Sequence, residues 1–232
     1  MELSYICKGK GKDLVFFHGY GANKECFLRQ IDYFSRSYKV TAFDFPGFGK
    51  SDALPFPFSV GDYAAVTETF LSRQGIIKPF VVAHSFGARV AVKMAAQKDV
   101  FDRLVLTGPA GIIDNRNAAY RLKIFKYRLL RRFSVRYAEA HCGSKEYRCL
   151  SPLMKESYKK IVNEDLRLAA KRIRCPVLII EGEKDSATPL RQAKIYAETI
   201  PKAKLVVMKN CTHFAFLDDP LAFQLSVEEF LS

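Results

Sequence analysis

Short apolar runs recur along the chain and alternate with longer segments of helical periodicity. In several runs, such as residues 13–17 and 104–107, consecutive positions are apolar, which is typical of strands buried on both faces of a parallel sheet. This alternation implies a mostly parallel sheet flanked by helices, the α/β class. The expected strands cover residues 2–8, 13–17, 38–43, 78–82, 104–107, 175–181 and 203–208. The expected helices cover residues 25–37, 59–72, 88–96, 190–200 and 220–231.

The segment 112–172 interrupts this alternation. It contains no strand signal, and its periodicity predicts three or four helices. We therefore expect an α/β core made of residues 1–111 and 173–232, with a helical cap of residues 112–172 inserted between them.

Length and composition are those of a single compact unit. The chain has 232 residues, of which 49% are hydrophobic, enough for one sizeable core. No apolar run reaches the roughly 18 residues of a membrane span, so no transmembrane segment is expected. The first residues lack the basic and then apolar pattern of a signal peptide. We therefore expect a cytoplasmic protein.

The net charge of +13 is concentrated in the predicted cap. Residues 112–172 contain 16 Lys and Arg against 6 Asp and Glu, a net charge of +10, whereas the remaining residues contain 21 against 18, a net charge of +3. No nucleic-acid recognition motif accompanies the charge, so we expect no nucleic-acid partner.

The six cysteines, at positions 7, 26, 142, 149, 175 and 211, are scattered. No CxxC spacing occurs among them, so the sequence signals neither a zinc site nor a redox pair. We expect no metal and no cofactor.

The pentapeptide 83–87, Ala-His-Ser-Phe-Gly, stands between an apolar strand and a strong helix former. A serine flanked two residues away on each side by a small residue, Ala83 and Gly87, is typical of a nucleophile elbow. Such a turn would expose Ser85 beside a helix N-terminus, which favours negative charge. The alternative is that Ser85 is an ordinary N-cap.

Other polar motifs also follow expected strands. His18-Gly19-Tyr20 ends one strand, the segment 181–185 (Glu-Gly-Glu-Lys-Asp) ends another, and His213 follows a third. Because the carboxyl ends of parallel strands share one edge of the sheet, these residues should lie together there. Along the chain the order is serine, acid, histidine, which is the order that α/β-hydrolases use.

With the motifs HGYG, DFPGFGKSD, AHSFG, GEKD and CTHF in this order, the chain resembles the α/β-hydrolase family over essentially its full length. The resemblance implies that Ser85 is the nucleophile, His213 its general base and Asp185 the acid that orients the histidine. Rival acids are weaker: Glu181 and Glu183 precede the end of the loop, while Asp218 and Asp219 are better placed to begin the last helix. His213 could instead be a hydrogen-bonded loop histidine, and Asp185 an ordinary turn aspartate.

The same resemblance assigns the oxyanion hole to two backbone N–H groups, those of Tyr20 and Phe86. His18 is expected to be structural, and Asp44 and Ser51 to shape the DFPGFGKSD loop. Serine at the elbow argues against haloalkane dehalogenases and epoxide hydrolases, which have aspartate there; cofactor-free haloperoxidases are harder to exclude. By analogy with such relatives, we expect hydrolysis of a small-molecule carboxylic ester through an acyl-enzyme. A thioesterase, an amidase and a C–C bond hydrolase are alternatives, and so is a non-catalytic binding module.

The predicted cap contains an amphipathic segment, residues 117–137. Phe125, Leu129 and Phe133 recur at helical spacing and are expected to line an apolar acyl pocket. The loop HGYGANKECF is similar to that of the carboxylesterases that act on pimeloyl-carrier protein, whose caps bind an acidic carrier protein. The basic residues of this segment could therefore bind an acidic carrier or an anionic surface, or form a solvated face. They are Arg121, Lys123, Lys126, Arg128, Arg131, Arg132 and Arg136.

Overall fold

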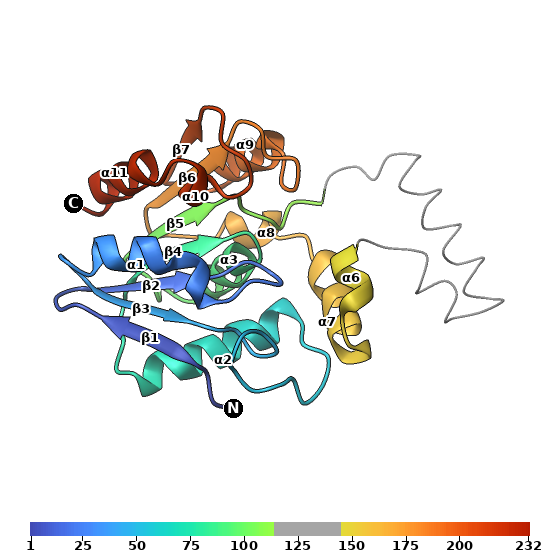
Figure 1. Cartoon of the computed structure of the whole chain (residues 1–232). Helices are drawn as coiled ribbons and strands as arrows, with labels where there is room; N and C mark the ends of the chain where they lie inside the picture. Colours follow the sequence, from blue (N-terminus) through green and yellow to red (C-terminus); the bar gives the residue numbers. More distant parts are fainter. Residues whose placement is uncertain (114–144) are drawn as a thin grey trace.

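The computed structural model describes residues 1–113 and 145–232, and within these ranges seven strands form a single sheet (Figure 1). The strand order is β1-β3-β2-β4-β5-β6-β7. Strand β1 pairs antiparallel with β3, and every other pairing is parallel. The strands are β1 (Tyr5–Lys8), β2 (Asp13–Phe17), β3 (Lys39–Phe43), β4 (Phe80–His84), β5 (Arg103–Thr107), β6 (Val177–Gly182) and β7 (Ala203–Met208). The mostly parallel α/β sheet expected from the sequence is confirmed.

Helices connect the strands and cover both faces of the sheet (Figure 1). They are a short 3₁₀ helix, η1 (Lys24–Phe27), and α1 (Leu28–Phe34), α2 (Val60–Arg73), α3 (Phe86–Gln97), α6 (Lys145–Cys149), α7 (Pro152–Val162), α8 (Arg167–Ala170), α9 (Leu190–Thr199), α10 (Ala215–Asp218) and α11 (Pro220–Leu231). The sequence predicted one helix over 25–37, where η1 and α1 follow one another, and it missed the single turn of α10. Among the described residues, no helix is long and apolar enough to cross a bilayer.

Two hydrophobic cores lie on opposite faces of the sheet, because side chains alternate along each buried strand. In β2, Leu14 and Phe16 belong to the core beneath α1 and α11, whereas Val15 and Phe17 belong to the core beneath α2, α3 and α9. All four side chains are fully buried. Burial on both faces explains why this strand has no polar position in its interior.

Local capping places the helices at the expected positions. At the start of α2, Ser59 Oγ accepts from the Asp62 N–H, and the Asp62 carboxylate accepts from the Ser59 N–H, a reciprocal capping box. At the start of α11, Pro220 follows Asp219, whose carboxylate accepts from the Ala222 N–H. The prediction that Asp218 also begins this helix is wrong. Asp218 ends α10, and its carboxylate accepts from the Thr212 N–H and hydroxyl.

Candidate active site

Ser85 stands in a sharp turn between β4 and α3, in the left-handed region of backbone space with φ 50° and ψ −106°. For a residue with a side chain this conformation costs about 1–3 kcal/mol and is common at functional sites. The turn is tight: a Cβ on Gly87 would lie 2.4 Å from the Phe17 carbonyl oxygen of the neighbouring strand. The small residue that the sequence analysis required at this position is therefore needed for close backbone approach.

The HGYG loop after β2 lies against the same serine. A Cβ on Gly19 would lie 3.5 Å from Ser85 Cβ, so the loop backbone passes directly beside the hydroxyl-bearing residue. Within the described residues, no hydrogen-bond acceptor is found for the Tyr20 N–H or for the Phe86 N–H, which begins α3. Two unpaired donors near Ser85, one of them at a helix N-terminus, form a local environment suited to negative charge.

Asp185 lies in the loop that follows β6, and its carboxylate is almost fully hydrogen-bonded. Oδ1 accepts from the backbone N–H groups of Ala187 at 2.7 Å and Thr188 at 2.9 Å. Oδ2 accepts from the Thr188 hydroxyl at 2.9 Å. Burial alone would raise the pKa of Asp185, but the bonds from His213 and the Thr188 N–H hold it well below its ordinary value. Asp185 is therefore an anion at neutral pH.

His213, in the loop after β7, connects this anion to the serine. Its Nδ1 lies 2.6 Å from Asp185 Oδ2, and its Nε2 lies 3.0 Å from Ser85 Oγ. Because the carboxylate can only accept, Nδ1 carries the proton and Nε2 is left to accept the Ser85 hydroxyl. The structure thus brings together three residues that are 128 and 28 positions apart in sequence.

Two further histidines near the site are held neutral by burial. His18 Nδ1–H donates to the Gly19 carbonyl, and its Nε2 accepts from the Phe45 N–H, so His18 links the HGYG loop to the DFPGFGKSD loop. Burial lowers its pKa to about 4. The ring of His84 lies 4.6 Å from that of His213, and burial followed by the charge of His213 lowers the His84 pKa to about 3. Both nitrogens of His18 are hydrogen-bonded and His84 is neutral, and we assign neither a proton-transfer step.

The DFPGFGKSD loop is organised by Asp44, as the sequence analysis expected. Its carboxylate accepts from the Lys24 ammonium at 2.7 Å and from the backbone N–H groups of Lys24 and Lys50. The Ser51 hydroxyl donates to the Asp44 carbonyl at 2.6 Å. Asp44 is fully buried, so these bonds fix the loop rather than face a substrate.

Helix α7 lies over the HGYG loop. The Tyr20 hydroxyl donates to the Met154 carbonyl at 3.2 Å, and the rings of Tyr20 and Tyr158 are 5.1 Å apart. At the other end of the helix, the Arg89 guanidinium donates to the carbonyls of Ile161 and Glu164. Part of the segment between β5 and β6 is therefore anchored on the core beside the site (Figure 1).

The remaining site predictions concern the amphipathic segment. Phe125, Leu129 and Phe133, with the basic residues around them, lie outside the described residues. One residue that the sequence analysis missed is Thr188, whose hydroxyl contacts Asp185 Oδ2 and lies 3.2 Å from His213 Nδ1. The sequence feature that could have identified it is its position three residues after Asp185, because an aspartate often accepts hydrogen bonds from residues that follow it in a turn.

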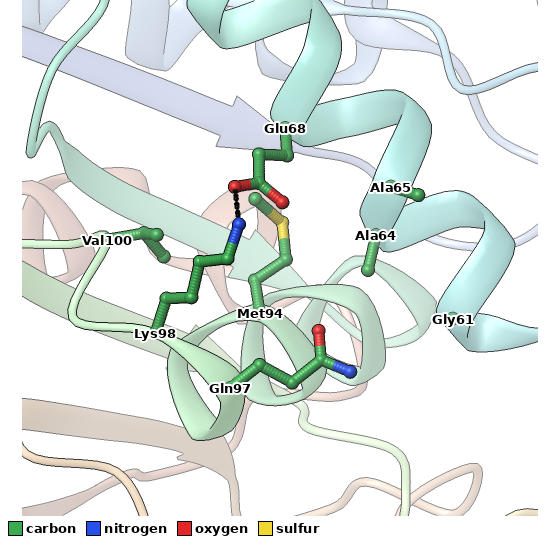
Figure 2. Close-up of a pocket in the computed structure, with 8 residues that line it drawn as sticks. All are labelled: Gly61, Ala64, Ala65, Glu68, Met94, Gln97, Lys98 and Val100. Carbon is green, nitrogen blue, oxygen red and sulfur yellow. Dashed lines mark hydrogen bonds and ion pairs between the residues drawn. The ribbon is translucent and has the colours of Figure 1, made fainter.

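A shallow groove of about 210 Å³ lies elsewhere, between α2 and α3 (Figure 2). The Glu68–Lys98 ion pair crosses it. None of its lining residues belongs to the cluster around Ser85, so the groove is not part of the candidate site. They are Gly61, Ala64, Ala65, Glu68, Met94, Gln97, Lys98 and Val100.

Comparison with known proteins finds a family match and several similar proteins. The model of the alpha/beta hydrolase family matches residues 14–223. The chain is 27% identical over 255 residues to a pimeloyl-[acyl-carrier protein] methyl ester esterase of Chromobacterium violaceum, in a match that covers 100% of this chain and 98% of that protein.

Solved structures show the same architecture. The esterase EaEST from Exiguobacterium antarcticum has a TM-score of 0.78 at 20% identity, covering 98% of this chain and 94% of that one. The enol-lactonase from Burkholderia xenovorans LB400 has a TM-score of 0.78 at 22% identity, covering 99% and 96%. At these identities the likeness establishes the fold, and the two proteins differ in the reactions that their names give.

Proposed function

The chain belongs to the alpha/beta hydrolase family, and we propose that it hydrolyses a carboxylic ester through an acyl-enzyme formed on Ser85. The observation that carries this proposal is the continuous hydrogen-bonded line from Asp185 Oδ2 through His213 to Ser85 Oγ, with bonds of 2.6 Å and 3.0 Å. A binding module would need none of these three residues in this arrangement.

In the proposed reaction, His213 Nε2 takes the proton of the Ser85 hydroxyl as Oγ attacks the ester carbonyl. The tetrahedral intermediate collapses, the C–O bond to the alcohol breaks, and His213 returns the proton to the leaving alkoxide. Water, deprotonated by the same nitrogen, then attacks the acyl-enzyme and releases the acid and free Ser85. Asp185 stabilises the imidazolium in both halves and keeps the Nδ1–H tautomer.

The oxyanion hole of this reaction is proposed to consist of the Tyr20 and Phe86 N–H groups. Phe86 directly follows Ser85 and begins α3, which adds the positive end of a helix dipole. Tyr20 follows Gly19, whose backbone lies against Ser85. Because charge on the carbonyl oxygen appears only in the transition state, such donors act on the rate, each by about 10²–10³-fold.

We propose that residues 112–172 form a cap that selects the substrate. The contact between Tyr20 and Met154 supports this, since it places α7 on the oxyanion loop. Phe125, Leu129 and Phe133 remain the proposed acyl-pocket residues, on sequence periodicity alone. The net charge of +10 over this segment, with the full-length similarity to an esterase named for an acyl-carrier protein substrate, supports an acidic carrier as the bearer of the ester.

The experiment that tests the proposal is labelling with a fluorophosphonate, followed by hydrolysis of p-nitrophenyl esters of increasing acyl length. We expect one phosphonylated serine, Ser85, and a rate that depends on chain length. Ser85→Ala, which removes only the hydroxyl, should lose the label and about 10⁶-fold in kcat while keeping the circular dichroism spectrum. Labelling or turnover that survives in this variant would exclude Ser85 as the nucleophile.

A further inference from the structure

Glu181 is a buried acid beside the candidate site that the proposed reaction does not use. It lies near the end of β6, with a side chain that is 0% exposed. By strand alternation it shares a face of the sheet with Val177 and Ile179, which belong to the apolar core beneath α9. An ionised carboxylate without partners in such a place is strongly disfavoured.

The hydrogen bonds of Glu181 and Asp185 are unequal. In the described part of the chain, neither Oε1 nor Oε2 of Glu181 accepts a hydrogen bond. Its side chain contacts the carboxyl of Asp185, which receives donors from Ala187, Thr188 and His213. Two ionised carboxylates are both acceptors, so as anions they would only repel one another. A single proton between them turns this contact into an O–H···O bond.

We propose that Glu181 is held as the neutral carboxylic acid and donates its O–H to the Asp185 carboxylate, so that it is a positioning residue that acts on His213 through Asp185. Its effect on catalysis rests on the proposed function of the Ser85 site, whereas its protonation does not. The bond gives Asp185 a donor from the strand itself, in addition to those from its own loop and from His213.

The proton belongs to Glu181 because Asp185 already has the donors that stabilise an anion. Burial, followed by the contact with Asp185, raises the pKa of Glu181 to about 9. The pKa of Asp185 moves in the opposite direction. This divergence is typical of two carboxyl groups that share one proton.

Few other titratable groups face this pair. His213 contacts Asp185 directly, and His84 lies behind His213 and is neutral. The ionisable side chains of the elements that pack against β6 are engaged elsewhere or exposed. Asp218 of α10 bonds with Thr212, Glu228 of α11 with Tyr33 and Tyr196 of α9 with Ala110, while Lys194, Glu198 and Lys204 are exposed.

A neutral donor on Asp185 has a defined effect on His213. By sharing the negative charge of the carboxylate, the O–H weakens the attraction of Asp185 for the imidazolium form of His213, which is therefore less stabilised than it would be without Glu181. Above about pH 9 Glu181 itself ionises. The O–H donor is then lost and a second negative charge appears beside Asp185, which disrupts the line to Ser85.

Infrared difference spectroscopy tests the protonation directly, on the wild-type protein against E181Q. At pH 7 we expect a protonated-carboxyl C=O stretch, above the carboxylate bands, that E181Q lacks and that fades as the pH passes about 9. A difference spectrum with only carboxylate bands would overturn the proposal, whether or not the protein has esterase activity.

The pH profile of kcat/KM tests the positioning role. E181Q replaces one neutral donor with another, so the stabilisation of the imidazolium, and with it the midpoint of the acid limb, should stay in place. E181M, of similar size but without a donor, should move that midpoint to higher pH. A downward shift in E181Q would mean that an anion had been removed, and would overturn the proposal. If E181M folds and the midpoint does not move, Glu181 contributes only to packing and the positioning role is wrong. If E181M does not fold, the result for E181Q still shows whether Glu181 is neutral or charged.

Discussion

Two acid–base pairs lie at the carboxyl edge of the sheet, and they differ in what their geometry permits. Lys24 Nζ lies 2.7 Å from Asp44 Oδ2, with the side chains 6% and 0% exposed. His213 Nδ1 lies 2.6 Å from Asp185 Oδ2, with the side chains 16% and 0% exposed. Each aspartate is also held by backbone N–H groups of its own loop or its neighbour's. The two carboxylates are thus alike in their burial and in the backbone N–H groups that bind them.

The difference lies in the partner. The side chain of Lys24 ends in a single nitrogen, which is bound to Asp44, so the pair can only hold two loops together. An imidazole has a second nitrogen and an ordinary pKa near 6.5, so His213 can take a proton from Ser85 while Asp185 holds the other side of the ring. The Lys24–Asp44 pair is structural because, among the described residues, the Lys24 ammonium is bonded only to the aspartate. We propose that the His213–Asp185 pair is catalytic because the second nitrogen of the histidine contacts the Ser85 hydroxyl.

The largest expected effect is a loss of activity when the aspartate of the His213–Asp185 pair is changed. Asp185→Asn should lower kcat by about 10⁴-fold, because an amide no longer enforces the Nδ1–H tautomer or stabilises the imidazolium. The melting temperature should change little, since the amide oxygen still accepts from the loop N–H groups. Steady-state kinetics with a p-nitrophenyl ester, alongside thermal melts, measures both. Near-normal turnover would make Asp185 a turn residue only.

The matching change in the other pair should act on stability. Asp44→Asn leaves the Lys24 ammonium buried without a counter-charge, which costs about 3–5 kcal/mol. The double variant D44N/K24M, in which no charge remains, should recover part of this loss. Urea unfolding at pH 7 measures the free energies, and kcat of the folded fraction should fall far less than in D185N. A 10³-fold or greater loss of kcat in folded D44N would abolish the distinction between the pairs.

The stability difference between wild type and D44N should also depend on pH. Burial alone would raise the pKa of Asp44, but the bonds from Lys24 and Lys50 hold it below its ordinary value. A depressed pKa stabilises the folded state above the unfolded pKa of about 3.9, and this contribution is lost as the pH falls through the folded value. The gap in melting temperature should be constant from pH 5 to 8 and shrink below about pH 4. A gap that widens on acidification would contradict this linkage.

A smaller effect is expected at Thr188, whose hydroxyl donates a hydrogen bond to the Asp185 carboxylate. Among the described bonds, the Asp44 carboxylate accepts from no hydroxyl group, so this donor distinguishes the two pairs. Thr188→Val keeps the shape and removes the donor to Asp185 Oδ2, which should lower kcat by about 10–100-fold with KM unchanged. Thr188→Ser retains the hydroxyl and is the matched control. Equal losses in the two variants would assign the effect to packing.

The smallest effect concerns charges that act at a distance. Reversing Arg128, Arg131 and Arg132 to Glu should slow capture of an ester on an acidic carrier by up to about tenfold at low ionic strength, and added salt should shrink the difference. Hydrolysis of a small neutral ester should hardly change. Equal losses on both substrates would indicate a damaged cap, and no loss on either would leave the basic residues as a solvated face.

The order of strands and helices and the elbow at Ser85 can both be predicted from the amino-acid sequence. Buried parallel strands are continuous apolar runs, and the tight turn needs small residues on both sides. Both features therefore depend on residues that are neighbours along the chain. The prediction that His213 and Asp185 would meet Ser85 came from their place at strand ends and from the family resemblance. Local sequence does not contain the bond lengths or the tautomer, because these depend on loops that approach one another only in the folded chain.

The environment of each polar group, in contrast, depends on how the chain folds. Glu181 and Asp185 are both acids near the end of one strand, and sequence reasoning ranked them only by position. Folding surrounds Asp185 with donors and buries Glu181 among apolar side chains, so their pKa values diverge. Likewise, the bond from the Thr188 hydroxyl to the Gly108 carbonyl and the bond from the Tyr20 hydroxyl to the Met154 carbonyl join residues 80 and 134 positions apart. Desolvation and hydrogen bonding are set by neighbours in space, and no pattern along the chain specifies them.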